Sequence, residues 1–328
     1  MKVAFYSTQA YDRDSFDLIN QNGMHEFLYF DINLNIQTVK LAQGCQAICI
    51  FVNDHADADV LRALAAIQVK IVVLRCAGFN QIDLEEAKRL NMQVLRVPAY
   101  SPEAVAEHAV AMILTLNRKT HKAYNRVRDG NFSLNRLIGF NLHGKTVGVI
   151  GLGKIGLAFC KIMHGFGCKV LGYDPLATQV PDYIHLVTID ELFASSDIIS
   201  LHCPLLSSTL HIINEQRLAQ MKDGVMLINT SRGGLIESKP IIQALKDGKV
   251  GFLGIDVYEQ EEKLFFKDLS EDIIDDDDIL RLMSFPNVLI TAHQGFLTRE
   301  ALFEIAHTTI QNLADAEQGI ESKNSLTT

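Results

Sequence analysis

The sequence contains no tryptophan, only 7 prolines and only 6 cysteines in 328 residues. No two cysteines form a C-x-x-C pair, so their spacing does not predict a zinc site. Scattered cysteines are typical of proteins that stay reduced, and Cys45 and Cys49, which flank a strand-like run, are expected in a core. We therefore expect a cytoplasmic protein without a metal site.

Charge and hydrophobicity argue against two further classes of partner. The formal net charge is −9 with a pI of about 5.6, and no run of Lys or Arg offers a site for nucleic acid. No apolar stretch is long enough to span a membrane, and residues 1–7 (MKVAFYS) predict a first strand rather than a signal peptide. The acidic run Asp275–Asp278 is expected to be a solvated loop.

Length and a hydrophobic content of 48% predict a compact protein of two domains.

A glycine-rich turn follows a short buried strand in the middle of the chain. Residues 147–156 read VGVIGLGKIG, in which Gly151, Gly153 and Gly156 have the G-x-G-x-x-G spacing. The first glycine allows the turn, the second lets a pyrophosphate approach the backbone, and the third lets the next helix pack on the strand. The positive end of that helix faces the phosphate charge.

The residues after this turn favour a dinucleotide site. Apolar residues at helical spacing follow, and a second strand, Lys169–Tyr173, ends at Asp174. In a Rossmann unit an acid at this place bonds the adenosine ribose hydroxyls. Because its charge would repel a 2′-phosphate, the pattern favours NAD over NADP.

The first hundred residues alternate strand-like and helical runs, which is typical of a parallel α/β sheet. One predicted strand leads to Ala77 and Gly78, which either let a ligand approach the backbone or form an ordinary strand-to-helix turn. Residues 98–102 contain two prolines and break the chain before a long apolar helix, so we place the first domain crossing there. His108 on that helix could line a cleft or be structural.

Three later strands lead to residues that suit acid–base chemistry. The predicted strands at 225–229, 250–255 and 287–291 are followed by Arg232, by the acids Glu259 and Glu261, and by His293. Ligands of doubly wound sheets bind at the carboxyl ends of the strands. The guanidinium of an arginine suits the carboxylate of an α-keto or α-hydroxy acid, and a histidine can give a proton to a ketone and take it back from an alcohol.

A carboxylate beside the histidine would favour its imidazolium form. Glu261 is preferred for that role and Glu259 is the alternative. A nicotinamide cofactor would then exchange hydride with the keto carbon while His293 balances the proton. Each residue alone also fits a structural role, but together with the glycine-rich turn they favour a dehydrogenase.

Several motifs resemble those of the D-2-hydroxyacid dehydrogenase family. They are GLGKIG at 151–156, Asp174-Pro175, HCPL at 202–205, NTSRG at 229–233, GIDVYE at 254–259 and TAH at 291–293. Within that family, the segments FVND at 51–54, RCAGFN at 75–80 and NFS at 131–133 are similar to fermentative D-lactate dehydrogenases. The resemblance covers nearly the whole chain.

The resemblance implies NADH-dependent, reversible reduction of pyruvate to D-lactate. It implies that Arg232 binds the substrate carboxylate, that His293 is the acid/base and that Glu261, rather than Glu259, supports the histidine. It also implies two doubly wound parallel-sheet α/β domains. A Rossmann NAD-binding domain (101–297) is inserted in a flavodoxin-like catalytic domain (1–100 and 298–328), with closure about a hinge.

The resemblance and the glycine motif together assign the remaining site residues. Those expected to contact NAD are Gly151, Gly153, Lys154, Ile155, Gly156, Asp174, Cys203, Pro204, Thr209, Thr230, Ser231, Arg232 and Asp256. Those expected to contact substrate are Ala77, Gly78, Tyr100, Arg232 and Phe296. Members of the family are usually dimers and some fermentative ones are tetramers, so we expect a homodimer or homotetramer.

Two other functions compete with D-lactate dehydrogenase. A dehydrogenase for a larger 2-keto acid would share the chemistry, although the aromatic residues Tyr100 and Phe296 favour a small, partly apolar pocket. An NAD-sensing scaffold, as in corepressors that resemble this family, would bind the nucleotide with negligible turnover. The presence of Arg232, Glu261 and His293 argues against the scaffold.

Overall fold

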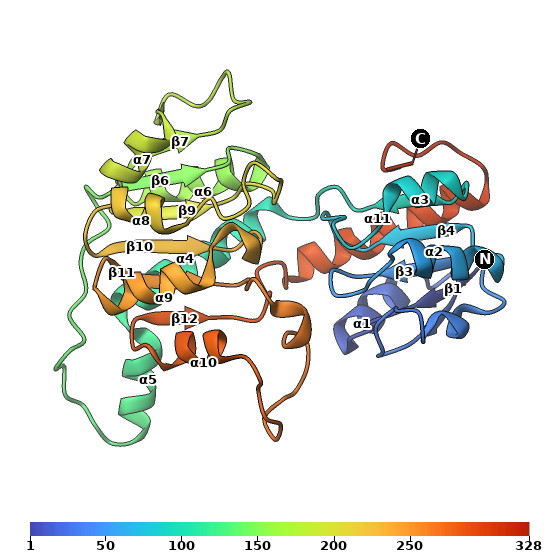
Figure 1. Cartoon of the computed structure of the whole chain (residues 1–328), viewed down its shortest axis with the longest axis horizontal. Helices are drawn as coiled ribbons and strands as arrows, with labels where there is room; N and C mark the ends of the chain where they lie inside the picture. Colours follow the sequence, from blue (N-terminus) through green and yellow to red (C-terminus); the bar gives the residue numbers. More distant parts are fainter. Residues whose placement is uncertain (328) are drawn as a thin grey trace. The chain divides into compact units, whose positions relative to one another are not determined.

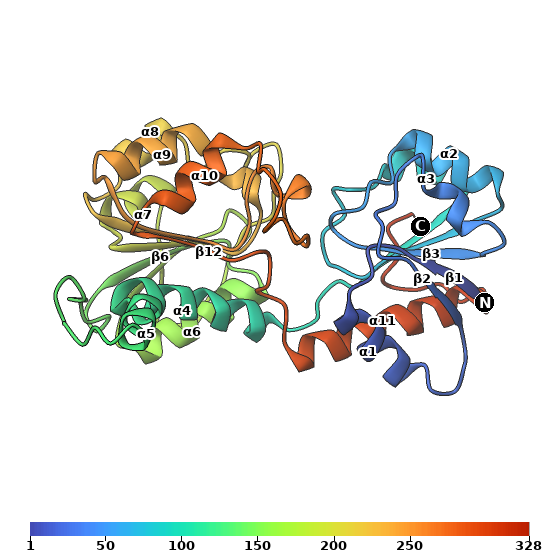
Figure 2. The ribbon, with the colours of Figure 1, turned by 90° about the horizontal axis from the view of Figure 1, so that it is seen from below.

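The computed structural model describes residues 1–327 and divides into two compact units (Figure 1). Unit 1 comprises Met1–Ser101 and Leu297–Thr328, and unit 2 comprises Pro102–Phe296. The chain thus leaves unit 1, builds the whole of unit 2 and then returns. In each unit a parallel sheet lies between two layers of helices (Figure 2). The expected fold class, two doubly wound α/β domains, is confirmed.

The sheet of unit 1 has five parallel strands in the order β2-β1-β3-β4-β5, which is the flavodoxin-like order. The strands are β1 (Lys2–Phe5), β2 (Glu26–Tyr29), β3 (Ala47–Ile50), β4 (Ile71–Leu74) and β5 (Gln93–Arg96). Helices α1 (Ala10–Ile19) and α11 (Arg299–Glu317) cover one face, and α2 (Ala58–Ala66) and α3 (Leu84–Arg89) cover the other (Figure 2). A short 3-10 helix, η1 (Val39–Ala42), precedes β3.

The sheet of unit 2 has seven parallel strands in the order β12-β11-β10-β9-β6-β7-β8. They are β6 (Thr146–Ile150), β7 (Lys169–Tyr173), β8 (Ile184–Leu186), β9 (Ile198–Leu201), β10 (Val225–Asn229), β11 (Val250–Ile255) and β12 (Val288–Ile290). The strand order reverses between β6 and β9. This is the Rossmann arrangement, in which a dinucleotide lies at the point of reversal.

Helices cover both faces of this second sheet (Figure 2). One layer contains α4 (Pro102–Arg118), α5 (Thr120–Arg128) and α6 (Lys154–Gly165). The other contains α7 (Ile189–Ser195), α8 (Glu215–Gln220), α9 (Ser238–Lys246) and α10 (Asp277–Ser284). The 3-10 helices η2 (Gly233–Leu235) and η3 (Glu261–Lys263) follow β10 and β11. Because both faces are covered, strands such as β9 and β10 are buried throughout and consist mainly of apolar residues.

The acidic run at 275–278 differs from its prediction. Asp276 caps α10, its Oδ1 accepting a hydrogen bond of 3.0 Å from the Ile279 N–H. Asp277 and Asp278 form the first turn of that helix, where negative side chains are stabilised by the unpaired N–H groups. The prediction of a solvated loop is therefore wrong for residues 276–278. The prediction that Cys45 and Cys49 lie in a core is confirmed, since both are buried.

A buried cation joins the elements of unit 1. Arg75, 1% exposed, follows β4 and donates to the Ser7 carbonyl at 2.7 Å. Its Nε lies 3.3 Å from the Asp12 carboxylate of α1, and its guanidinium stacks on the rings of Phe5 and Phe51. Because a buried charge requires such partners, Arg75 fixes where β4 ends against β1 and α1.

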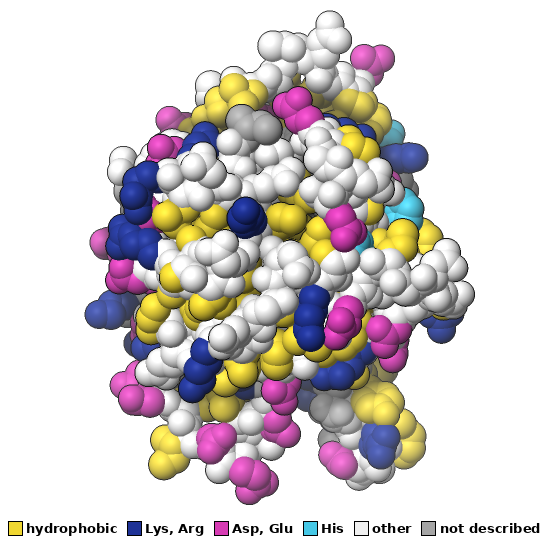
Figure 3. Space-filling model, turned by 90° about the vertical axis from the view of Figure 1, so that its right-hand side faces the viewer, with side chains coloured by type: hydrophobic (Ala, Val, Ile, Leu, Met, Phe, Trp, Pro, Cys, Tyr) yellow, Lys and Arg dark blue, Asp and Glu magenta, His cyan; other side chains and the backbone are white. Residues whose placement is uncertain are grey.

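The surface is mixed in charge. On the face in Figure 3, Lys and Arg side chains are interspersed with Asp and Glu. Within residues 1–327, no helix has both the length and the apolar character that a membrane span requires.

Candidate active site

The glycine-rich turn lies where the strand order of unit 2 reverses. Gly151 has φ +94°, and a Cβ there would lie 2.6 Å from the Cys203 backbone nitrogen. A Cβ on Gly156 would lie 2.0 Å from the Gly151 carbonyl oxygen. These two positions therefore require glycine for steric reasons. A Cβ on Gly153 would meet nothing within 4 Å, so the middle of the turn is open.

Helix α6 begins in this opening without a side-chain cap. The first N–H groups of an α-helix have no acceptor within the helix, so those of Lys154 and Ile155 are available to an anion. Asp174, at the end of β7, adjoins the turn because its Oδ2 accepts from the Leu152 N–H at 2.8 Å. A pyrophosphate and a ribose would therefore meet donors and an acid at adjacent places.

The segments after β9 and β10 are bonded to each other. Ser231 Oγ donates to the Cys203 carbonyl at 2.6 Å. Thr209 Oγ1 donates to the Pro204 carbonyl at 2.7 Å. Thr230 Oγ1 is buried and has no hydrogen-bond partner among the described residues. An unpaired buried hydroxyl at the carboxyl end of β10 fits a polar ligand there, and the donor set as a whole fits a dinucleotide.

Arg232 follows β10 and keeps its charge unpaired. Its Nη1 donates to the Ser231 carbonyl at 2.7 Å, and its own carbonyl accepts from Asn229 Nδ2 at 2.8 Å. Within residues 1–327 no carboxylate forms an ion pair with it. The next residue, Gly233, passes so close to Tyr258 that a Cβ would lie 2.0 Å from the Tyr258 carbonyl. The backbone is thus fixed while the guanidinium can still bind an anion.

His293 and Glu261 form a pair at the ends of β12 and β11. The His293 Nδ1 lies 2.8 Å from Glu261 Oε1, and the two side chains are 14% and 18% exposed. The other oxygen of Glu261 accepts from the Tyr258 N–H at 2.8 Å. Glu261 is therefore held from both sides, and its partner is the histidine singled out in the sequence.

Glu259, the alternative acid, faces a different set of residues. Its Oε1 lies 2.6 Å from His211 Nε2, and its Oε2 accepts from Ser238 Oγ at 2.7 Å. Both of its oxygens are therefore engaged away from His293.

Asp256 organises the backbone that carries His293. Its carboxylate, 1% exposed, accepts from the N–H groups of Gln294 and Gly295 at 2.9 and 2.8 Å. Its carbonyl accepts from the His293 N–H at 2.7 Å, and His293 itself has φ +53°. Burial acts to raise the pKa of Asp256, but hydrogen bonds from His108, Thr291 and Gln294 outweigh it, so the pKa lies below its usual value. The ionised carboxylate thus holds a backbone conformation that is unusual for histidine.

His108, which the sequence left open, belongs to this network. Its Nε2 lies 3.1 Å from Thr291 Oγ1 and 3.3 Å from Asp256 Oδ1. Helix α4 thereby contacts the carboxyl ends of β11 and β12 through His108. No local pattern in the sequence points to this contact, because more than 140 residues separate His108 from Asp256.

The expected substrate residues lie in both units, and each group is described within its own unit. Ala77 and Gly78 follow β4 in unit 1, and Tyr100 precedes Ser101, the last residue of the first stretch of that unit. Phe296 is the last residue of unit 2 and is 6% exposed.

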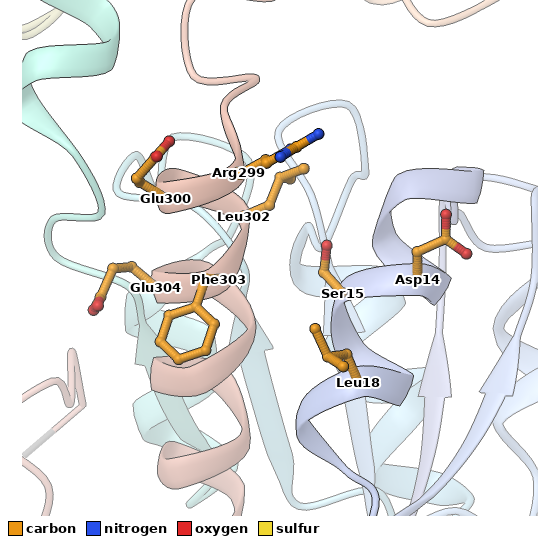
Figure 4. Close-up of a pocket in the computed structure, with 8 residues that line it drawn as sticks. All are labelled: Asp14, Ser15, Leu18, Arg299, Glu300, Leu302, Phe303 and Glu304. Atoms are coloured by element: carbon orange, nitrogen blue, oxygen red, sulfur yellow. The ribbon is translucent and has the colours of Figure 1, made fainter.

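A separate hollow of about 570 Å³ lies within unit 1, between α1 and α11. Figure 4 shows Ser15 and Leu18 of α1 facing Leu302 and Phe303 of α11, with charged side chains at the rim. None of the site residues above lines it. Within residues 1–327, no three His, Cys, Asp or Glu side chains are arranged to hold a metal ion.

These features together are those of an NAD-dependent dehydrogenase. They are a Rossmann sheet with an uncapped glycine-rich turn, an acid after its second strand and a His–Glu pair at its carboxyl edge. The model of the D-isomer specific 2-hydroxyacid dehydrogenase NAD binding domain matches residues 110–295. The chain belongs to the D-isomer specific 2-hydroxyacid dehydrogenase family.

Individual relatives match over the whole chain. A D-lactate dehydrogenase of Escherichia coli K12 is 52% identical over 328 residues, 99% of this chain and 100% of the relative. The pyruvate reductase of Chlamydomonas reinhardtii superposes with a TM-score of 0.91 at 44% identity, covering 99% of this chain and 98% of the other. A D-lactate dehydrogenase of Aquifex aeolicus, solved with NAD and lactic acid, gives a TM-score of 0.87 at 33% identity, covering 99% of each chain.

We expect His202 to make the stability of the protein depend on pH. Burial lowers the pKa of His202 to about 3; its ring packs on Phe159 and its Nε2 lies 2.9 Å from Ser200 Oγ. Below a pH of about 6.5, this histidine binds a proton in the unfolded chain but stays neutral in the folded protein. Stability should therefore fall between pH 6.5 and 3, by up to about 1.4 kcal/mol per pH unit.

Urea unfolding at pH 7.5 and pH 5.5 measures this dependence. His202→Gln should lose less stability on acidification than the wild type, because glutamine does not titrate. His185→Gln, at an exposed position of β8, is the matched control and should behave like the wild type. Equal losses in all three proteins would show that His202 is not held neutral.

Proposed function

We propose that the chain is a D-lactate dehydrogenase that reduces pyruvate with NADH, reversibly. The observation that carries the proposal is the 2.8 Å contact between His293 and Glu261, in the same unit as the unpaired cation of Arg232. The names of the relatives support the substrate, since they are a D-lactate dehydrogenase, a pyruvate reductase and an enzyme solved with lactic acid.

NADH supplies the hydride when bound. The residues proposed to hold it are Gly151, Gly153, Lys154, Ile155, Gly156, Asp174, Cys203, Pro204, Thr209, Thr230, Ser231, Arg232 and Asp256. Asp174 would accept from the ribose hydroxyls and disfavour a 2′-phosphate. The carboxylate of Asp256 already accepts bonds from neighbouring backbone groups, so its main task would be to position His293.

Arg232 binds the carboxylate of the keto acid through its guanidinium, and this charge-assisted contact orients the ketone. Ala77, Gly78, Tyr100 and Phe296 are proposed to contact the rest of the substrate. The aromatic side chains would leave room for a methyl group and exclude water from it.

His293 donates the proton that the ketone oxygen needs and takes it back in the reverse reaction. Because Nδ1 faces Glu261, the Nε2–H is the group that can reach a substrate. Glu261 orients the imidazole ring through Nδ1, and the Tyr258 N–H keeps the carboxylate in place. In this proposal, His293 is the member of the pair that transfers the proton.

The two units take different tasks in this proposal. Residues 101–297 would be the NAD-binding domain, and residues 1–100 with 298–328 would be the catalytic domain, with a hinge between them. The same proposal places the enzyme in the cytoplasm, where the six unbridged cysteines stay reduced.

We also propose a homo-oligomer, as a dimer or tetramer. After α5, Phe132, Leu134 and Ile138 are 75%, 80% and 86% exposed. In the same unit, a hollow of about 520 Å³ has mostly apolar lining, including Leu264, Phe265 and Ile290. Exposed apolar surface of this kind is typical of a protein–protein interface, which a second copy of the chain would cover.

The substrate is tested by NADH oxidation with pyruvate, 2-ketoisocaproate and hydroxypyruvate in parallel, followed by chiral analysis of the product. We expect fast turnover of pyruvate to D-lactate and weak turnover of the others. NADPH should replace NADH poorly because of Asp174. Preference for 2-ketoisocaproate would leave the chemistry intact and refute the pocket assignment, whereas NADH binding without turnover of any acid would favour a scaffold.

Variants of the His–Glu pair test the mechanism. His293→Ala should lower kcat by at least about 100-fold while NADH affinity, followed by fluorescence, stays unchanged, because only the proton donor is lost. Glu261→Gln should also lower kcat, because His293 then loses the carboxylate that orients its ring. Glu259→Gln is the matched control and should keep activity, since Glu259 faces His211 instead. Equal effects of the two glutamate variants would contradict the assignment.

The oligomer is tested by light scattering after size exclusion. Leu134→Asp combined with Ile138→Asp should give a particle near the chain mass of 36.5 kDa, because buried charges weaken an apolar interface. Ile36→Asp, at a position of unit 1 that is 57% exposed, should keep the wild-type mass. A wild type that is already monomeric would refute the proposal.

A further inference from the structure

Two consecutive carbonyls after β4 are held by side chains. The Ala77 carbonyl accepts a 2.9 Å hydrogen bond from Arg96 Nη1, and the Gly78 carbonyl accepts from Cys76 Sγ at 3.2 Å. Gln81 Nε2 in turn donates to Cys76 Sγ at 3.3 Å. The orientation of the turn is thus fixed by side chains acting on its carbonyl oxygens.

The N–H groups of the same peptides face the other way. Within residues 1–327 all peptide bonds are trans, and in a trans peptide the C=O and N–H point in opposite directions. Among the described residues, no hydrogen bond uses the N–H of Ala77, Gly78 or Phe79. An unpaired backbone N–H group is free to donate to an anion.

Arg96 is itself firmly placed. It ends β5, where its N–H donates to the Asn324 carbonyl at 3.1 Å and its carbonyl accepts from Asn312 Nδ2 at 2.9 Å. Its guanidinium lies over the Phe79 ring, 5.2 Å from the centroid. Within residues 1–327 no carboxylate pairs with it, so its positive charge is not neutralised.

We propose that Arg96 is a positioning residue, which orients and polarises the Ala77–Gly78 peptide so that the Gly78 N–H binds the substrate carboxylate. This inference rests on the proposed function, in which Ala77 and Gly78 contact a 2-keto acid. A cation on the carbonyl draws electron density from the amide, which makes its N–H a stronger donor. The unpaired charge also attracts the carboxylate directly.

The arginine is not interchangeable with lysine in this role. The planar guanidinium can stack on Phe79 and donate to the Ala77 carbonyl at once, whereas a lysine ammonium supplies charge without the stacking. Charge alone should therefore restore part of the effect. A residue that only stabilised the fold would not separate substrate affinity from cofactor affinity.

Steady-state kinetics and binding of oxamate, an unreactive analogue of pyruvate, test the inference. In Arg96→Met, KM for pyruvate and Kd for oxamate on the NADH complex should rise about tenfold, the value of one lost charge-assisted hydrogen bond. The Kd for NADH should be unchanged and kcat should fall much less. Arg96→Lys should lie between the variant and the wild type. Arg89→Met, which removes an exposed cation of α3, should behave like the wild type.

The outcomes separate this inference from the proposed function. If the wild type reduces pyruvate and Arg96→Met leaves both pyruvate KM and oxamate Kd unchanged, the positioning role is refuted and the proposed function stands. If NADH affinity and melting temperature fall along with substrate affinity, Arg96 is merely structural and the inference also fails. A wild type that reduces no 2-keto acid would overturn both.

Discussion

The carboxylate of Asp256 is the constraint on which the catalytic edge of unit 2 depends. It is buried at the end of β11 and accepts hydrogen bonds from the backbone that follows β12. Those bonds stabilise His293 at a positive φ, which a histidine would not adopt without compensation. Two residues beyond Asp256, the Tyr258 N–H orients Glu261. The buried charge therefore sets the backbone of His293, and the turn that follows it sets Glu261.

Unit 1 has a comparable arrangement, in which the buried charge is positive instead of negative. There the buried cation of Arg75 joins the end of β4 to α1 and to the Ser7 carbonyl. The next residues along the chain are those of the Ala77–Gly78 turn. In both units, an ionised side chain at a strand end is stabilised by many partners and determines where the following loop can lie.

The two sheets can be predicted well from the sequence because buried parallel strands leave a clear apolar signal, as in β10. The charge of residues 276–278 alone predicts a solvated loop, and this prediction is wrong because Asp276 caps a helix. Spacing alone could not separate Glu261 from Glu259, since both follow β11 and only the turn around Tyr258 decides which one reaches His293. The contacts of His108 and Arg96 cannot be predicted from the sequence. His108 joins segments distant along the chain, and the contact of Arg96 depends on the orientation of one carbonyl group.

The interruption of unit 1 by unit 2 has a consequence for synthesis on the ribosome. Unit 2 is continuous, so it can fold as soon as residue 296 has emerged. Unit 1 cannot be completed then, because α11, which packs beside α1, is made last (Figure 2). Until α11 has emerged, the side of α1 that packs on it stays uncovered, although Phe16 can already pack on Phe5 and Phe27 of the sheet. The nascent chain can therefore carry a folded unit 2 while unit 1 is still incomplete, and the synthesis of α11 determines when unit 1 can close its core.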